Sequence, residues 1–577
     1  MRYAIKTGIA VAIAAMAGAC GGEQTTSATK ETAAQETAAQ SGAAQSGAAQ
    51  AGGTGISAES LARHIATLSD DSFEGRAPAT AGGEKTRAYL IDEMKAIGLE
   101  PANGDSFEQE TPLVEITADP AQSYLRINGE ALAYGGDAVF WTKRVREEVA
   151  FEDSPMVFVG YGVVAPEYGW NDYEGLDVEG KTVVMLVNDP GYASEDPDLF
   201  NGRAMTYYGR WTYKFEEAAR QGAAAAIIVH QTAPASYGWG VVEGSWSGAQ
   251  LDLDRPDGGA GRVALEGWIQ EDVARALFAR AGLDFDETAA AAHAPGFAPV
   301  EMAGLAASGK LVNAIRRSAS ANVAGMLRGA THPDEYVLYM AHWDHLGVAA
   351  PSPDGGADED LVSNGAVDNA TGTGGILAIA EAFVRNETPP ARSIVFMGVT
   401  AEESGLLGSG YFAEDPFIPL ENIVGGVNID GLQPTPPAKD IIVVGYGASE
   451  LEDILKDAAE KRDLYLRPDM SPESGYFYRS DHISLAKKGV PMLYAGSGVD
   501  FVDGGEDAGL AFMEDYRAKR YHAPADEYSA DWDLRAMTRT LNALYDVGAG
   551  LAYSDAWPTW YEGNEFRALR DAQRAGG

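Results

Sequence analysis

The spacing of apolar positions changes along the chain, and each spacing predicts a different element. Near the N-terminus, residues 61–68 and 83–97 repeat apolar positions at helical spacing, and Gly98 is placed to end the second helix. The middle of the chain is rich in Gly and Tyr, and it contains short apolar runs bounded by turn residues, as in 155–159, 182–187 and 224–229. These runs predict strands in a β-rich middle segment.

Beyond about Gly309, short apolar strands alternate with helical stretches. The alternating elements are residues 336–341, 374–384, 393–399, 423–429, 451–461, 490–494 and 534–551. Alternation of this kind is typical of an α/β fold with a mostly parallel sheet and helices on both faces.

Composition bounds the possible classes of protein. The chain has 577 residues, 45% hydrophobic and 22% charged, which is enough apolar material for at least one large core. Its 85 acidic and 43 basic residues give a formal net charge of −42. Nucleic acid and anionic membrane surfaces would repel such a body, so neither is an expected partner.

The N-terminus has the pattern of an export sequence. Arg2 and Lys6 precede the apolar run 8–19, which is short for a bilayer span, and small residues lead into Cys20, the single cysteine. This arrangement resembles a bacterial lipoprotein processing box, although Ala17 stands where a larger aliphatic residue is usual. It implies a signal peptide over 1–20 and a lipid on Cys20, and an ordinary secretory signal is the alternative.

Residues 21–55 consist mainly of Ala, Gln, Thr, Ser and Gly, with ETAAQ and SGAAQ each occurring twice. Such a stretch has little to bury and predicts a flexible tether. No later segment is long and apolar enough for a bilayer span, so the lipid is the expected membrane anchor. We therefore expect an exported protein on the periplasmic or cell-surface side, and the absence of Asp after Cys20 favours the outer membrane.

Candidate metal ligands follow three of the expected strands. AHWDHLG contains His342, Asp344 and His345, TAEESG contains Glu402 and Glu403, and NIDG contains Asp430. Open parallel sheets place their sites outside the carboxyl ends of the strands, so we expect these segments to converge.

Two further segments add ligand types. VDNATGTGG supplies Asp368 just before a helix, and YHAPADEY supplies His522. Taken alone, Asp368 would be a helix N-cap and the Glu pair a solvated turn. The chain has only eight histidines, however, and three of them lie in these motifs. Imidazole and carboxylate ligands without a thiolate favour zinc over calcium or magnesium.

Together these motifs, in this order, resemble the zinc aminopeptidases of the M28 type, which hold two zinc ions and act on peptides. Each expected role belongs to a residue of a quoted motif. The resemblance implies that His342 and Asp430 bind one zinc ion, that Glu403 and His522 bind the other, and that Asp368 bridges both. It also implies that Glu402 is the general base and that Asp344 holds the His342 imidazole in its tautomer. It assigns no role to His345.

Independently of the family, neighbouring residues at a strand end point in opposite directions. Glu403 can therefore face a metal ion while Glu402 faces the attacking water. No Ser or Cys nucleophile is required, and no GxSxG pentapeptide with a suitable downstream His is present.

The segment 478–498 resembles the border of the substrate pocket in the same family. Tyr476 or Tyr478 could donate a hydrogen bond to the developing oxyanion. Asp481 and His482 could be pocket groups, but a cap for a helix over 482–488 is the favoured role of Asp481.

The middle segment resembles a protease-associated domain, through VFVGYGVVAPEYGWNDYEGLDVEGKTVVMLVNDPGY and RQGAAAAIIVH. In relatives this module is inserted within the peptidase and has no catalytic residues. The expected organisation is a zinc exopeptidase fold over 56–135 and 306–560, an insertion over 136–305 and a tail over 561–577.

Two other functions remain open. One is an M20-type carboxypeptidase or deacylase, which also has an HxD motif and a Glu pair, but whose accessory domain follows that pair rather than preceding HxD. The other is a binding protein on the same fold that has lost its ligands, which the complete ligand set disfavours.

Overall fold

The structure of the chain is a computed structural model that describes residues 55–351, 356 and 359–575. The expected signal peptide, Cys20 and nearly all of the tether lie outside the described residues. Within the described part, no helix has both the length and the apolarity to cross a bilayer.

The main sheet has a parallel centre and antiparallel margins. Neighbouring strands β17, β14, β18 and β21 run parallel, whereas β19 on one side and β13, β2 and β11 on the other pair antiparallel. The strands are β1 (Glu100–Pro101), β2 (Glu108–Ala118), β11 (Ala249–Leu253), β13 (Val300–Leu327), β14 (His332–His342), β17 (Arg392–Val399), β18 (Ile423–Asn428), β19 (Asp440–Val444), β20 (Tyr465–Pro468) and β21 (Met492–Ser497).

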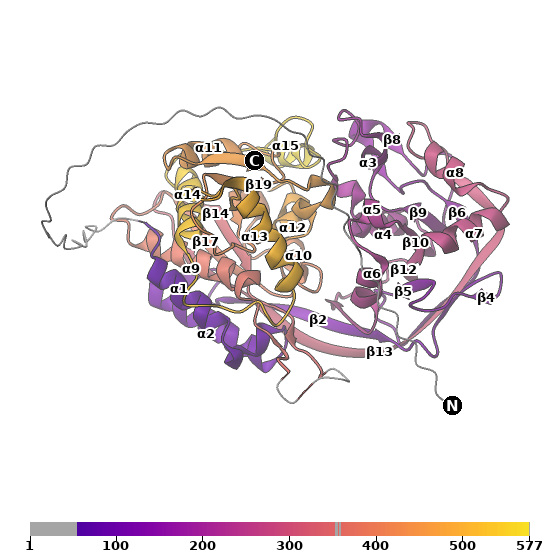
Figure 1. The fold of residues 1–577 in the computed structure, drawn as a ribbon, viewed down its shortest axis with the longest axis horizontal. Coiled ribbons are helices and arrows are strands. Elements are labelled where there is room, and N and C mark those ends of the chain that lie inside the picture. The colour runs from indigo at the N-terminus through magenta and orange to yellow at the C-terminus, as the bar shows by residue number, and fades with distance from the viewer. Residues whose placement is uncertain (1–54, 352–355, 357–358, 576–577) are drawn as a thin grey trace, which may run out of the picture. The chain divides into compact units, whose positions relative to one another are not determined.

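Helices cover both faces of this sheet (Figure 1). One face packs against α1 (Ala58–Leu68), α2 (Ala81–Ile97), α9 (Thr371–Val384), α11 (Leu451–Glu460) and α14 (Arg535–Ala552), and the other against α10 (Leu407–Glu414) and α12 (His482–Ala486). Helices α13 (Gly505–Lys519) and α15 (Arg567–Ala575) complete this part. The predicted α/β fold is confirmed.

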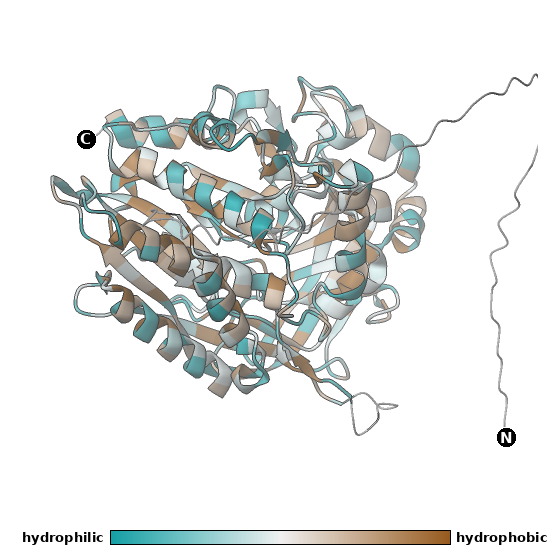
Figure 2. Ribbon diagram, turned by 60° about the vertical axis from the view of Figure 1, so that its left-hand side comes forward, coloured by the Kyte–Doolittle hydropathy of each residue, from teal (hydrophilic) through white to brown (hydrophobic). Residues whose placement is uncertain are grey.

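Local sequence explains how these elements start, stop and orient. In α1 the Ser57 side chain accepts from the Ser60 amide, and α2 ends at Gly98 in the left-handed conformation, as predicted. Along β14, Tyr339 belongs to one core cluster and its neighbours Leu338 and Met340 to the other. The strands are accordingly hydrophobic on both faces, and Figure 2 shows them between helices of mixed polarity.

A second sheet lies in the inserted lobe, which we define as residues 124–312. Its strands are β3 (Tyr124–Ile127), β4 (Glu130–Ala131), β5 (Ala138–Trp141), β6 (Glu148–Phe158), β9 (Thr182–Leu186), β10 (Ala225–His230), β12 (Leu265–Gln270) and the first part of β13. Its helices are α3 (Pro190–Ser194), α4 (Trp211–Arg220), α5 (Thr232–Ala235), α6 (Trp239–Trp246), α7 (Glu271–Arg280) and α8 (Phe285–Ala291). The strands predicted at 155–159, 182–187 and 224–229 correspond to β6, β9 and β10.

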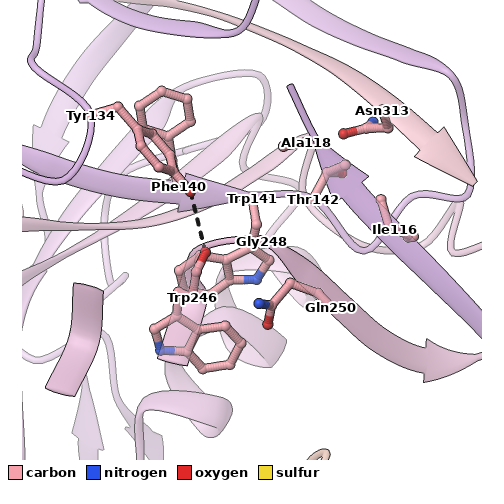
Figure 3. Close-up of a pocket in the computed structure, with 10 residues that line it drawn as sticks. All are labelled: Ile116, Ala118, Tyr134, Phe140, Trp141, Thr142, Trp246, Gly248, Gln250 and Asn313. Atoms are coloured by element: carbon pink, nitrogen blue, oxygen red, sulfur yellow. Dashed lines mark hydrogen bonds between the residues drawn. The ribbon is translucent and has the colours of Figure 1, made fainter. Parts of the chain in front are cut away.

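Strand β13 belongs to both sheets and links them. Its first part pairs with β3 and β6, and its second part pairs with β2 and β17 (Figure 1). Close to β13, Trp141 and Trp246 stack with ring centroids 4.0 Å apart, and Tyr134 Oη donates to the Trp246 carbonyl at 3.3 Å (Figure 3).

The inserted lobe also contacts the main body, by which we mean the rest of the described chain, at a place away from β13. Lys487 Nζ lies 3.0 Å from Glu216 Oε1, and the Met205 amide donates to the Pro472 carbonyl at 3.1 Å. The lobe is thus held both by β13 and by this second contact.

Arg76, between α1 and α2, ties the N-terminal helices to two loops at the end of the sheet. Its guanidinium is buried and donates to the carbonyls of Leu68, Trp343, Asn364 and Gly365 at 2.6–2.9 Å. Burial lowers its pKa to about 10, so the side chain remains charged at neutral pH.

We predict that Arg76→Met lowers the free energy of unfolding by about 3 kcal/mol or more, because several buried carbonyls lose their donor. Urea denaturation measures the change. Arg63→Met is the control, because the Arg63 side chain is 47% exposed and its ion pair with Glu93 lies at the surface, so the expected loss is at most about 1 kcal/mol. Equal losses for the two variants would contradict this role of Arg76.

Candidate metal centre

Three neighbouring parallel strands deliver the first candidate ligands to one edge of the sheet. His342 is the last residue of β14, Glu402 and Glu403 lie shortly after β17, and Asp430 lies shortly after β18. Strand β14 lies between β17 and β18, so the structure brings the three motifs together as the sequence predicted.

Asp368 and His522 reach the same place from loops. Asp368 lies just before α9, and the neighbouring Asn369 accepts from the Gly431 amide at 3.2 Å and donates to the Ile429 carbonyl at 3.0 Å. The loop that carries Asp368 is thereby fixed to the loop that carries Asp430. His522 follows α13, and its side chain is 37% exposed.

The donor atoms form a chain around the Asp368 carboxylate. His342 Nε2 lies 3.2 Å from Asp368 Oδ1 and 3.3 Å from Asp430 Oδ1. His522 Nε2 lies 3.2 Å from Asp368 Oδ2 and 3.1 Å from Glu403 Oε2. Each oxygen of Asp368 therefore faces a different histidine, as a bridging ligand requires.

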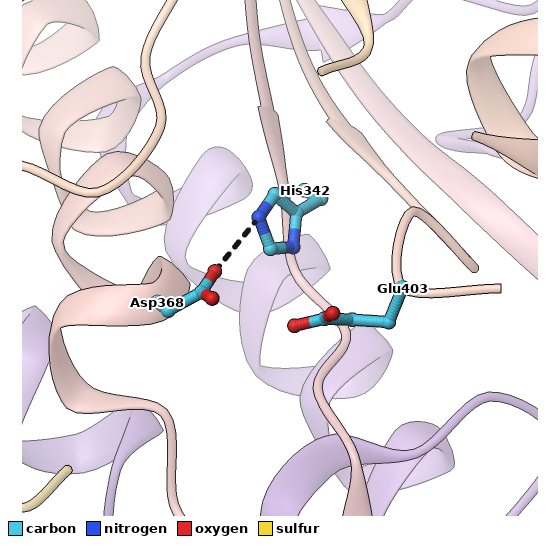
Figure 4. A group of neighbouring side chains, drawn as sticks. All are labelled: His342, Asp368 and Glu403. Atoms are coloured by element: carbon cyan, nitrogen blue, oxygen red, sulfur yellow. Dashed lines mark ion pairs between the residues drawn. The ribbon is translucent and has the colours of Figure 1, made fainter. Parts of the chain in front are cut away.

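These spacings fit zinc. Donor atoms about 2.0 Å from one zinc ion at the corners of a tetrahedron lie about 3.3 Å apart, close to the observed separations. His342, Asp368 and Glu403 offer ligand atoms that all lie within 4.8 Å of one another (Figure 4). Two imidazoles and three carboxylates without sulfur are also the donor types that zinc takes.

The histidines and carboxylates of the centre stabilise each other's charged forms. Burial opposes ionisation of Glu403, but hydrogen bonds from His345 and His522 lower its pKa to about 2. Burial likewise disfavours the charged form of His522, yet Asp368 and Glu403 raise its pKa to about 10. This concentration of carboxylates is suited to holding cations.

Glu402 behaves differently from Glu403. Burial raises its pKa well above the usual range, and the charges of Glu403, Asp430 and Asp481 raise it further. No ion pair joins Glu402 to His342 or His522 among the described residues, and Glu402 lines the same cavity as the candidate ligands. A carboxyl group with a raised pKa beside a metal centre is suited to proton transfer.

The structure adds two supporting residues that the sequence did not single out. Asp526 accepts from the amides of Val367 and Asp368 at 3.1–3.2 Å and so fixes the backbone of the bridging residue. Ser480 Oγ donates to Asp430 Oδ2 at 2.6 Å. Both residues lie within motifs that were recognised, but their partners are separated from them by 50 to 159 residues and no local pattern reveals them.

The expectation for Asp344 was wrong in its detail. His342 Nδ1 lies 4.0 Å from the Asp344 carboxylate but 3.2 Å from the backbone carbonyl of the same residue. The carbonyl therefore accepts the imidazole proton, while the carboxylate accepts from the Glu402 amide at 3.1 Å. Nδ1 is thus engaged by this carbonyl, and Nε2 is the ring nitrogen that faces Asp368, Asp430 and the metal position.

One expectation for the pocket segment was also wrong. Asp481 precedes α12 but makes no side-chain hydrogen bond that caps it, and its carboxyl group is buried, which raises its pKa to about 7. Tyr478 Oη donates to Glu565 at 2.8 Å, so its hydroxyl proton is engaged by that carboxylate in this structure. Tyr476 and Tyr478 both line the cavity, and both remain candidates.

The centre opens into a cavity of about 850 Å³ between the main body and the inserted lobe. Arg210 and Trp211 reach it from the lobe, and Tyr476 and Arg479 from the body. This volume lies within the range that is typical of ligand-binding pockets.

Known proteins resemble parts of this chain. Aminopeptidase NAALADL1 of Mus musculus is 32% identical over 164 residues, which are 26% of this chain and 20% of the relative. A glutamate carboxypeptidase 2 homolog of Caenorhabditis elegans is 33% identical over 118 residues, which are 19% of this chain and 13% of the relative. The chain thus spans about a fifth or less of the length of these relatives.

Solved structures overlap with more of the chain at lower identity. An aminopeptidase from Aneurinibacillus sp. strain AM-1 is 19% identical with a TM-score of 0.47, covering 87% of this chain and 95% of its own. A zinc aminopeptidase from Bacillus subtilis is 17% identical with a TM-score of 0.41, covering 87% and 96%.

The model of peptidase family M28 matches residues 322–546. This range contains the five candidate ligands His342, Asp368, Glu403, Asp430 and His522, as well as Glu402. The segment that carries the metal centre is therefore similar to peptidase family M28.

Proposed function

We propose that the protein is a co-catalytic di-zinc metallopeptidase that removes amino acids from the N-terminus of peptides. The observation that carries the proposal is the Asp368 carboxylate, whose two oxygens each face one histidine of a separate ligand pair. The match of residues 322–546 to peptidase family M28 supports the same activity.

The proposed ligands divide into two sets. His342 and Asp430 would hold one ion, Glu403 and His522 the other, and Asp368 both. When bound, two zinc ions acidify water and polarise the scissile carbonyl.

Glu402 would act as the general base in this site. Its carboxylate would take a proton from the attacking water and deliver it to the leaving amine. Burial and the neighbouring carboxylates raise its pKa well above the usual range, which favours the protonated form that would deliver the proton to the leaving amine. Asp344 would hold the Glu402 backbone in place through the amide contact described above.

The inserted lobe would limit which peptides reach the centre. It contributes Arg210 and Trp211 to the wall of the cavity, and its sequence resembles a protease-associated domain. We further propose, from the sequence around Cys20, that the protein is exported and anchored through a lipid on that residue.

Cleavage of a panel of substrates tests the activity. We predict that protein lacking residues 1–55 cleaves aminoacyl anilides and free-amine dipeptides but not their N-acetylated forms, and that a chelator abolishes cleavage. Dipeptide amides are included beside the free dipeptides because the amides lack the free carboxylate that Arg210 and Arg479 could bind. Cleavage of N-acylated substrates alone would contradict the proposal and favour the carboxypeptidase or deacylase.

Substitution of the base tests the mechanism. Glu402→Gln should lower kcat by about 10²–10⁴-fold because the amide cannot accept the water proton, while the zinc content stays unchanged. Glu387→Gln, at an exposed position, is the matched control. Wild-type turnover by Glu402→Gln would remove Glu402 from the mechanism.

Substitution of the bridging carboxylate tests the metal count. Asp368→Asn should bind fewer than two zinc ions per chain under conditions in which the wild type binds two, because the amide is a poor bridging ligand. Elemental analysis after dialysis measures the content, and Asp334→Asn, at an exposed position, is the control. Retention of two ions by Asp368→Asn would exclude a bridging role.

A further inference from the structure

We infer that His345 is a positioning residue for Glu403, which it orients so that one chosen carboxylate oxygen faces the metal position. The inference rests on the proposed di-zinc function. His345 is the one histidine of AHWDHLG to which the sequence assigned no role.

The contact between the two side chains is short and direct. His345 Nδ1 lies 2.6 Å from Glu403 Oε1, and both side chains are at least nine-tenths buried. An ionised carboxylate only accepts hydrogen bonds, so the proton must lie on Nδ1 of His345. Oε1 is thereby occupied, and Oε2 is the oxygen that faces His522 Nε2 at 3.1 Å.

The ring of His345 is itself held in place. Gly365 packs against it so closely that a Cβ at that position would lie 2.6 Å from two ring atoms, and the Gly365 carbonyl is fixed by Arg76. The other ring nitrogen, Nε2, has no hydrogen-bond partner among the described residues. The polar interaction of this buried side chain is therefore directed at a single group, the candidate ligand.

The opposite end of the centre repeats this arrangement with a different residue. Ser480 Oγ donates to Asp430 Oδ2 at 2.6 Å, which leaves Asp430 Oδ1 to face His342 Nε2 at 3.3 Å. Each terminal carboxylate thus has one oxygen held by a protein donor and one oxygen presented to a histidine ligand. The parallel indicates that the His345 contact orients a ligand and is not only a packing contact.

Orientation of Glu403 matters because a carboxylate ligand that can rotate loses freedom when the ion binds. Donors that fix a ligand in advance commonly change metal affinity by about 10–100-fold. The loss should be confined to the ion held by Glu403 and His522, because no hydrogen bond or ion pair joins His345 to His342 or Asp430 in the described part of the chain.

Zinc affinity provides a test that is separate from activity. Apo wild type, His345→Ala and His345→Asn would be titrated with zinc against a chromophoric chelator, with His332→Ala at an exposed site as the control. Circular dichroism and thermal unfolding of the apo proteins would verify that each variant is folded. Asn is chosen because its side-chain NH₂ can replace Nδ1–H.

We expect wild type and His332→Ala to bind two ions, and His345→Ala to bind one of them about 10–100-fold more weakly, with most of the loss recovered in His345→Asn. Unchanged affinity in His345→Ala would overturn the inference, as would equal weakening in His345→Ala and His345→Asn, which would indicate packing alone. If wild type bound no zinc, the proposed function itself would fail, so the two failures are distinguishable.

Discussion

The sharing of one carboxylate by two imidazoles is the constraint on which the site depends. Asp368 can face His342 and His522 at once only if its backbone is fixed, and that backbone is held by Asp526, while the adjoining Asn369 ties it to the loop after β18. Buried charges of this density are unfavourable unless each finds a partner. The interlocking of imidazoles and carboxylates satisfies them in part, and bound cations would satisfy them further.

The scaffold around the centre serves the same constraint. Parallel strands β17, β14 and β18 end at one edge, so residues from three motifs meet without long loops. Arg76 then joins the segment after β14 to the segment before Asp368 through the carbonyls of Trp343, Asn364 and Gly365, and it holds the end of α1 through the carbonyl of Leu68. Because backbone rather than side-chain groups are held, the geometry of the loops is fixed while the carboxylates stay available.

The inserted lobe is attached so that it can border the site without supplying a metal ligand. Strand β13 is continuous between the two sheets, which fixes one margin of the lobe, and the Lys487–Glu216 pair and the backbone contact to Pro472 fix another. The cavity lies between the lobe and the body and is lined from both. In the proposed peptidase, residues of the lobe that are far in sequence from the metal centre would select the size and shape of the substrate.

The sequence by itself determined the fold class, the main helices and strands, and the residues that meet at the strand ends, because apolar periodicity and strand order are local or nearly local properties. It also anticipated that Glu402 and Glu403 would have different environments. Only the tertiary structure decided which atoms form hydrogen bonds with one another. The carbonyl of Asp344, rather than its carboxylate, accepts from His342, Tyr478 is engaged by Glu565, and Asp481 is buried instead of capping α12. These hydrogen bonds depend on which groups the fold brings within reach, and most of those groups are distant in the chain. The same holds for the contacts of Arg76, Ser480, Asp526 and His345. A hydrogen bond forms or fails over a few tenths of an ångström, and no sequence pattern encodes distances that finely.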